Sequence, residues 1–196
     1  MGLRYFWARR AVATAAAAVF VLGVAGCAVL RGGISSAQDV ASITVTSSEF
    51  RAGGKLPREY SCEGTKGSPP LRWSSQPLPR AKTFAIVVDD SSSSDPAVHW
   101  VIYNIDRRTT ELGPGVSEDP PDGWTAMQAV LPGGKGKPGY VPPCPKSDGK
   151  PGNYRFSVYA LRDEVKVSEG APLSEILQKI ADLTIARGRL TAVDIE

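Results

Sequence analysis

The side chains able to perform chemistry are few, and a single histidine limits the choices. His99 is the only histidine among the 196 residues, so any Ser–His catalytic arrangement must use it. A serine run, Ser91–Ser94, precedes it, but without the G-x-S-x-G context of a nucleophile elbow. Serine runs are more often solvated loops than catalytic elements. The sequence therefore does not favour a hydrolase, and we expect this protein not to be an enzyme.

Two carboxylates near His99 in the sequence favour a role in anion binding over one in catalysis. Asp89 and Asp90 end the apolar run Thr83–Val88, and pairing of that run with the next apolar run would bring them near His99. A carboxylate beside an imidazole favours its protonated form and orients an N–H toward an anion. The alternative is a neutral histidine, packed beneath Trp100, that contacts no ligand.

The first 26 residues have the composition of an export signal. Basic residues within positions 1–10 are followed by a charge-free run. This run ends in Val24-Ala25-Gly26-Cys27, which resembles the lipobox of bacterial lipoproteins, where a diacylglycerol is attached to the cysteine. We expect a signal peptide over 1–26 and a lipidated Cys27 that anchors the protein to the extracytoplasmic face of the cell membrane. A transmembrane anchor is the alternative, because the uncharged stretch reaches Leu30 and about 20 residues cross a bilayer.

The other two cysteines, Cys62 and Cys144, are expected to form a disulfide in an oxidising compartment. A zinc site with His99 is the alternative, but two thiols and one imidazole fall short of the usual four ligands. The Gly-rich stretch Gly133–Gly139 is not a P-loop, because Lys137 is followed by proline. We therefore expect no metal and no cofactor.

The charge and composition of the rest of the chain limit the classes of molecule that it is expected to bind. Outside the leader, the remaining 20 basic side chains equal the 20 acidic ones, and no basic cluster is present, so nucleic acid is not an expected partner. Residues 27–42 form the lipidated N-terminus and a Gly/Ser-rich flexible tether. Residues 43–196 are expected to form one domain.

Short strands are expected to position these side chains. Alternating or apolar segments predict strands at Ile43–Thr46, Leu71–Trp73, Thr83–Val88, Val98–Ile105 and Tyr154–Leu161. One apolar stripe with helical period runs from Leu173 to Leu183, with Pro172 before it and Gly188 after its last turn. After Gly188, Val193 and Ile195 are expected on the inward face of a closing strand. The expected fold is a mainly β sandwich with one late C-terminal amphipathic helix.

The segments that carry these residues resemble the bacterial branch of the phosphatidylethanolamine-binding protein family. The resemblance covers about residues 43 to 196 and begins with the segments Leu56–Gly64 and Ser68–Trp73. The other motifs, in order, are Asp89-Asp90, His99-Trp100-Val101-Ile102-Tyr103-Asn104-Ile105, Gly139-Tyr140-Val141-Pro142-Pro143-Cys144-Pro145 and Tyr154-Arg155-Phe156-Ser157-Val158-Tyr159-Ala160-Leu161. The resemblance implies a β-sandwich whose small pocket takes anions such as phosphate-bearing head groups.

The resemblance also supplies a candidate ligand-binding site. The positions that match the family's pocket are Asp90, His99, Pro143 and Tyr154. Four other positions depart from the family: Ser91 and Ser92 replace a proline and a second aspartate, and Gly152 and Asn153 replace a second histidine and an arginine. Loss of a histidine donor removes a hydrogen bond worth about 1.5 to 3 kcal/mol when charged, which lowers phosphate affinity by about one to two powers of ten.

Two functions follow from these observations. The first is a lipid-anchored protein that binds a small anionic or phospholipid head-group ligand without chemistry. The second is a protein-interaction or inhibitor module acting through its surface loops, because the family is also associated with inhibition of kinases and proteases. An exported domain cannot reach cytosolic kinases, so its partner in this second case is an envelope or host protein.

Overall fold

The computed structural model describes residues 41–74, 80–147 and 149–196. Contacts divide the chain into the units Met1–Ala37 and Gln38–Glu196, and all the elements below lie in the second unit. This unit has its own hydrophobic cores and is the folding domain. The expected signal peptide over 1–26, the lipidation site Cys27 and the tether up to residue 40 lie outside the described residues.

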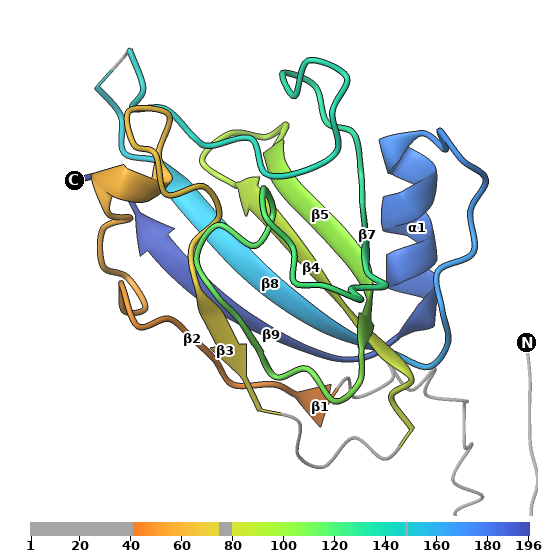
Figure 1. Cartoon of the computed structure of the whole chain (residues 1–196). Coiled ribbons are helices and arrows are strands. Elements are labelled where there is room, and N and C mark those ends of the chain that lie inside the picture. Colours follow the sequence, from red (N-terminus) through yellow and green to blue (C-terminus); the bar gives the residue numbers. More distant parts are fainter. Residues whose placement is uncertain (1–40, 75–79, 148) are drawn as a thin grey trace, which may run out of the picture. The chain divides into compact units, whose positions relative to one another are not determined.

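Two sheets form the framework (Figure 1). The larger has the strand order β1-β9-β8-β4-β5-β7 and the smaller the order β2-β3-β6. The larger sheet consists of β1 (Ala41–Ser42), β4 (Thr83–Asp90), β5 (Ala97–Asp106), β7 (Met127–Gln128), β8 (Asn153–Leu161) and β9 (Thr184–Val193). The smaller consists of β2 (Val45–Thr46), β3 (Leu71–Trp73) and β6 (Glu111–Leu112). The β1–β9 pair is parallel and the other pairs are antiparallel.

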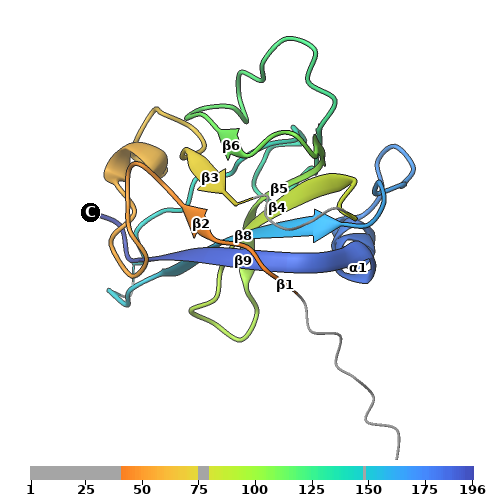
Figure 2. The same cartoon turned by 90° about the horizontal axis from the view of Figure 1, so that it is seen from below.

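Side chains at alternate positions of the central strands point to opposite faces of the larger sheet and belong to two hydrophobic cores. The inner face, with Ile86, Phe156 and Leu190, packs against residues of the smaller sheet such as Trp73. The outer face packs part of its area against the helix α1 (Leu173–Leu183). Figure 2 shows the smaller sheet and α1 on opposite sides of the larger sheet. The short 3₁₀ helix η1 (Arg58–Tyr60) lies in the connection between β2 and β3.

The helical stripe is confirmed, but the chain beyond it differs from the prediction. The helix ends at Leu183 and β9 begins at the next residue, so Gly188 lies inside a strand. A Cβ atom at Gly188 would lie 1.9 Å from the carbonyl oxygen of Ile43. The glycine therefore permits the close approach of two backbones and does not end the helix.

Two boundary predictions are corrected by the structure. Ala41 and Ser42, assigned to the tether, form β1, because the edge of β9 offers backbone partners that require no apolar pattern. Val193 is 40% exposed, whereas Ile195 is buried. Asp194 between them has a φ of 68°, which breaks the alternation of the strand and separates the faces of its two neighbours.

The fold class predicted from the sequence is confirmed: a mainly β sandwich with one α-helix near the C-terminus among the described residues. Within that part of the chain, no helix combines the length and the apolar character needed to cross a membrane.

Candidate functional site

The candidate site begins at the paired ends of β4 and β8. Asp90, the last residue of β4, lies directly opposite Tyr154 in the β4–β8 register. Side chains that face each other across such a pair have Cβ atoms about 5 Å apart. The preceding residue, Asp89, points to the opposite face and forms a bidentate ion pair with Arg155. The two adjacent aspartates therefore serve different faces of the sheet.

A β-bulge brings His99 to the same face. Val88 pairs with Trp100 while Asp89 pairs with Val98, so His99 is the extra residue of β5. A bulge places consecutive side chains on one face, and here His99 joins Trp100 on the inner side. The rings of His99 and Tyr154 make an edge-on contact, with centroids 6.0 Å apart and planes at 73°. The structure thus brings together three of the predicted site residues.

Asp90 is a buried carboxylate that is fully engaged by donors. Its Oδ1 accepts the backbone N–H of Ser92 at 3.0 Å and that of Asn153 at 2.9 Å. Its Oδ2 lies 3.0 Å from the Nζ of Lys146, which also donates to the hydroxyl of Ser92. Burial alone would raise the pKa of Asp90, but these hydrogen bonds outweigh it and hold the pKa well below its ordinary value. The site therefore contains a permanent carboxylate neutralised by an ammonium group.

The environment of His99 favours its neutral form, which is one of the two alternatives that the sequence left open. Burial lowers its pKa, and the opposing effects of its hydrogen bond to Val141 and of the nearby Asp90 charge do not compensate. Its Nδ1 lies 2.9 Å from the carbonyl oxygen of Val141. Because a carbonyl only accepts, Nδ1 carries the proton and Nε2 is left as an acceptor. The N–H at Nδ1 therefore points to the carbonyl of Val141 and not toward a ligand.

Tyr154 fills the space that a histidine side chain would need at position 152. Its side chain is 1% exposed, and burial together with the charges of Asp90 and Asp194 raises its pKa to about 12. A Cβ atom at Gly152 would lie 2.3 Å from Cζ of this ring. The departure from the family pattern at Gly152 is therefore matched by the position of the tyrosine ring.

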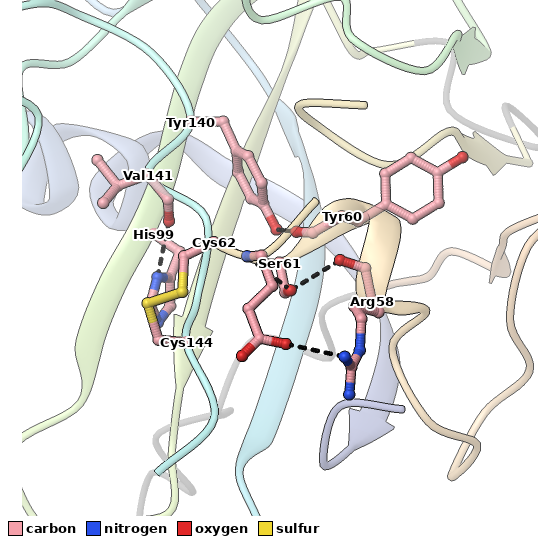
Figure 3. Close-up of a disulfide and its surroundings, with 9 residues drawn as sticks. Arg58, Tyr60, Ser61, Cys62, His99, Tyr140, Val141 and Cys144 are labelled. Atoms are coloured by element: carbon pink, nitrogen blue, oxygen red, sulfur yellow. Dashed lines mark hydrogen bonds and ion pairs between the residues drawn. A yellow bond between two sulfur atoms is a disulfide. The ribbon is translucent and has the colours of Figure 1, made fainter. Parts of the chain in front are cut away.

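Pro143 is held by backbone and disulfide contacts. It is buried, and its carbonyl oxygen accepts the backbone N–H of Cys62 at 2.9 Å. The predicted disulfide between Cys62 and Cys144 is present, with their Cα atoms 5.1 Å apart (Figure 3). The hydroxyl of Tyr140, from the same Pro-rich loop, donates to the backbone oxygen of Tyr60 at 3.0 Å. These contacts tie the loop to the segment around η1.

Lys146 was missed by sequence reasoning. It follows the Pro-rich motif in a loop, where no periodicity or spacing marks a lysine as a partner of an aspartate 56 positions earlier. The disulfide at Cys144 and the backbone contact of Pro143 place it beside Asp90. Only the three-dimensional path of the loop reveals this contact.

The four hollows given by the described residues lie away from the predicted site residues. Four surface hollows, with volumes from 330 to 500 Å³, occur among the described residues, and none of these four is lined by Asp90, His99, Pro143 or Tyr154. The described residues also contain no group of three or more His, Cys, Asp or Glu side chains arranged to hold a metal ion. Polar groups that an anion can contact are present at Asp90, where Lys146 forms an ion pair.

Comparisons with known proteins agree with this geometry. Residues 46–194 match the family described as phosphatidylethanolamine-binding protein, so the chain belongs to that family. It is 32% identical over 149 residues to the Mycobacterium tuberculosis protein named "Putative lipoprotein LppC", covering 76% of this chain and 70% of the relative.

Two solved structures share the fold. The crystal structure of Escherichia coli YbcL, described as a member of the mammalian family, has a TM-score of 0.69 at 28% identity and covers 80% of this chain and 99% of YbcL. A Chlamydia trachomatis homologue of phosphatidylethanolamine-binding proteins has a TM-score of 0.64 at 30% identity, covering 78% and 96% of the two chains.

Proposed function

We propose that this protein is a lipid-anchored extracytoplasmic binding protein that holds a small anion, such as a phosphate-bearing head group, where Lys146 meets Asp90. The observation that supports the proposal is the position of this ammonium group. It supplies a cation beside Asp90, at the place where the family resemblance puts the pocket but this chain lacks the family's second histidine and arginine. The lipoprotein name of a relative supports the anchor.

Binding uses the ammonium group of Lys146. The Lys146 side chain is 27% exposed, and its ammonium group has three N–H donors, of which Asp90 and Ser92 each accept one. An anion therefore accepts the third N–H or takes one donor from these two partners. Asp90 keeps its two backbone N–H donors when this happens, which limits the cost of the exchange. Protonation of His99 would add an N–H at Nε2, because Nδ1 is already committed to Val141.

Thermal unfolding with inorganic phosphate and phosphoethanolamine tests the proposal. A ligand at ten times its Kd stabilises a protein of this size by about 1.4 kcal/mol, which raises Tm by about 3 to 6 °C. Lys146→Gln should abolish this rise, measured against its own ligand-free Tm, while Lys179→Gln on the exposed side of α1 should retain it. Equal rises in both variants, or no rise in the wild type at millimolar phosphate, would refute the anion site.

The pH dependence gives an independent test. Because burial lowers the pKa of His99, its second N–H appears only below the ordinary value of about 6.5. Sulfate keeps its charge over this range, so its affinity should rise as pH falls from about 7 to about 5. His99→Gln should bind sulfate with an affinity that does not vary with pH. An affinity that is flat with pH in the wild type contradicts a role for the imidazole.

We propose as a second candidate function a protein-interaction module acting through its surface loops, because the four described hollows lie away from Asp90. In this case the loops around Asp90 bind a protein partner, such as an envelope or host protein. Cross-linking on intact cells that captures one partner with wild-type protein, together with an absence of any phosphate effect on Tm, would favour this function over anion binding.

A further inference from the structure

The outer face of the larger sheet is only partly covered by α1. Beyond the helix, Ser157 and Tyr159 of β8 lie opposite Arg189 and Arg187 of β9, respectively. These four side chains, with Ser42, Ile43 and Gly188, line a hollow of about 330 Å³. We call this surface the arginine hollow. Its volume is at the lower end of the range of about 300 to 1,000 Å³ typical of small-molecule sites.

The arginine hollow carries uncompensated positive charge. Arg187 and Arg189 are exposed, and neither forms an ion pair with another described residue. The Nε of Arg189 donates to the hydroxyl of Ser157 at 3.2 Å, a contact that leaves the guanidinium charge unpaired. On the neighbouring part of the same face, the carboxylate of Asp89 is already engaged by Arg155. An anionic partner is therefore the complement of this surface.

The hollow lies close in sequence to the expected lipidation site. Ser42 of β1 lines it, and β1 pairs with the beginning of β9 (Figure 2). Thirteen residues lie between Cys27 and Ala41. Flexible linkers of that length have a root-mean-square span of about 20 Å. A domain anchored at Cys27 thus keeps the arginine hollow within reach of the bilayer surface.

We propose that the arginine hollow is a membrane-facing site that binds the phosphate groups of anionic phospholipids in the bilayer that holds the anchor. The guanidinium groups of Arg187 and Arg189 contact lipid phosphates, and the hydroxyl groups of Ser42 and Tyr159 are polar groups at the same surface. This site is distinct from the one at Asp90, which lies on the inner face of the sheet. The orientation of the anchored domain rests on the lipid anchor of the proposed function, but the affinity of the hollow for anionic lipid does not.

The test uses the unit that begins at Gln38, which contains both cores and lacks Cys27. Its partitioning is measured by sedimentation with phosphatidylcholine vesicles and with vesicles that contain phosphatidylglycerol. Each arginine near an anionic surface contributes about fivefold to partitioning. The double variant Arg187→Gln/Arg189→Gln should therefore bind the anionic vesicles about 30-fold more weakly than wild type. High salt should remove the difference between the two kinds of vesicle.

A matched control removes two charges at the other end of β9. Arg51 and Lys55 are exposed and flank Gly53 and Gly54, which bond to Thr191 and Val193, so Arg51→Gln/Lys55→Gln should retain partitioning. Equal losses in the two double variants, or equal binding of wild type to both kinds of vesicle, would overturn the proposal. Inorganic phosphate is tested at the same phosphate concentration as the vesicle lipids supply. Saturation of the hollow by this free phosphate would also overturn the proposal, in favour of a soluble ligand. Each result is independent of the phosphate titration at Lys146.

Discussion

Removal of the Lys146 ammonium group, which pairs with Asp90, should lower the free energy of unfolding by an amount that depends on pH. In Lys146→Met, Asp90 keeps two backbone donors but loses its charged one. A hydrogen bond to a charged group contributes about 1.5 to 3 kcal/mol, whereas breaking a fully buried pair costs about 3 to 5 kcal/mol. Because Lys146 is 27% exposed and Asp90 retains donors, we expect a loss of about 1.5 to 3 kcal/mol at pH 7.

The pH dependence follows from the lowered pKa of Asp90. A carboxylate whose pKa is depressed in the folded state contributes stability that is complete above its unfolded pKa of about 3.9 and is lost as pH falls toward the folded value. The difference between wild type and Lys146→Met should therefore be constant from about pH 8 to about pH 5 and smaller at pH 3.

Urea unfolding followed by tryptophan fluorescence measures this difference, and a double-mutant cycle isolates the pair. In the cycle, adding Lys146→Met to Asp90→Asn should cost much less than adding it to wild type, because the carboxylate is already absent. Lys179→Met, on the exposed side of α1, is the matched control and should change stability by less than about 0.5 kcal/mol. A Lys146→Met variant as stable as this control at pH 7, or equally destabilised at pH 7 and pH 3, would refute the reasoning.

Three further predictions concern the disulfide, Gly152 and the anchor. Replacing Cys62 and Cys144 by serine opens a link between residues 82 positions apart and should cost about 4 to 5 kcal/mol in urea unfolding; a loss below about 1 kcal/mol contradicts this. Gly152→Ala should lose about 1 to 3 kcal/mol because its Cβ meets a buried ring, whereas Gly113→Ala meets nothing within 4 Å and should be neutral; equal stabilities would show that the ring yields freely. Cys27→Ser should lack the lipid-modified N-terminal peptide in mass spectrometry, and its persistence would disprove lipidation there.

The long central strands and the short strands β2 and β3 were predictable from the sequence, whereas β1, β6 and β7 were not. The residues of β4 are nearly all buried on both faces, so the apolar run that marks them is uninterrupted. By contrast, β1, β6 and β7 contain two residues each, and backbone pairing with a neighbour, not side-chain pattern, makes them strands. The strand after Gly188 was misplaced because a glycine needed for close packing has the same sequence signature as one that ends a helix.

At the candidate site, the sequence supplied the residues but not their electrostatic state. The family resemblance identified Asp90, His99 and Tyr154, and the structure brings them together. Burial lowers the pKa of His99, and the carbonyl of Val141, which lies 42 positions away, sets which ring nitrogen carries the proton. The partner of Asp90 depends in turn on how a disulfide directs the loop that carries Lys146. Both are properties of the folded loop, and no local pattern encodes them.

Because a disulfide holds its loop, the candidate site depends on whether the chain folds in an oxidising or a reducing compartment. Both cysteines are exposed, so reductants and oxidants in the surrounding solution have access to the bond. The loop that it secures contains Val141, whose carbonyl oxygen accepts a hydrogen bond from His99, and Lys146, the counter-ion of Asp90. In a reducing cytoplasm this covalent restraint would be absent, and the loop would depend on its weaker backbone contacts. Under the proposed export, passage into an oxidising compartment would also form the disulfide that holds this loop in place.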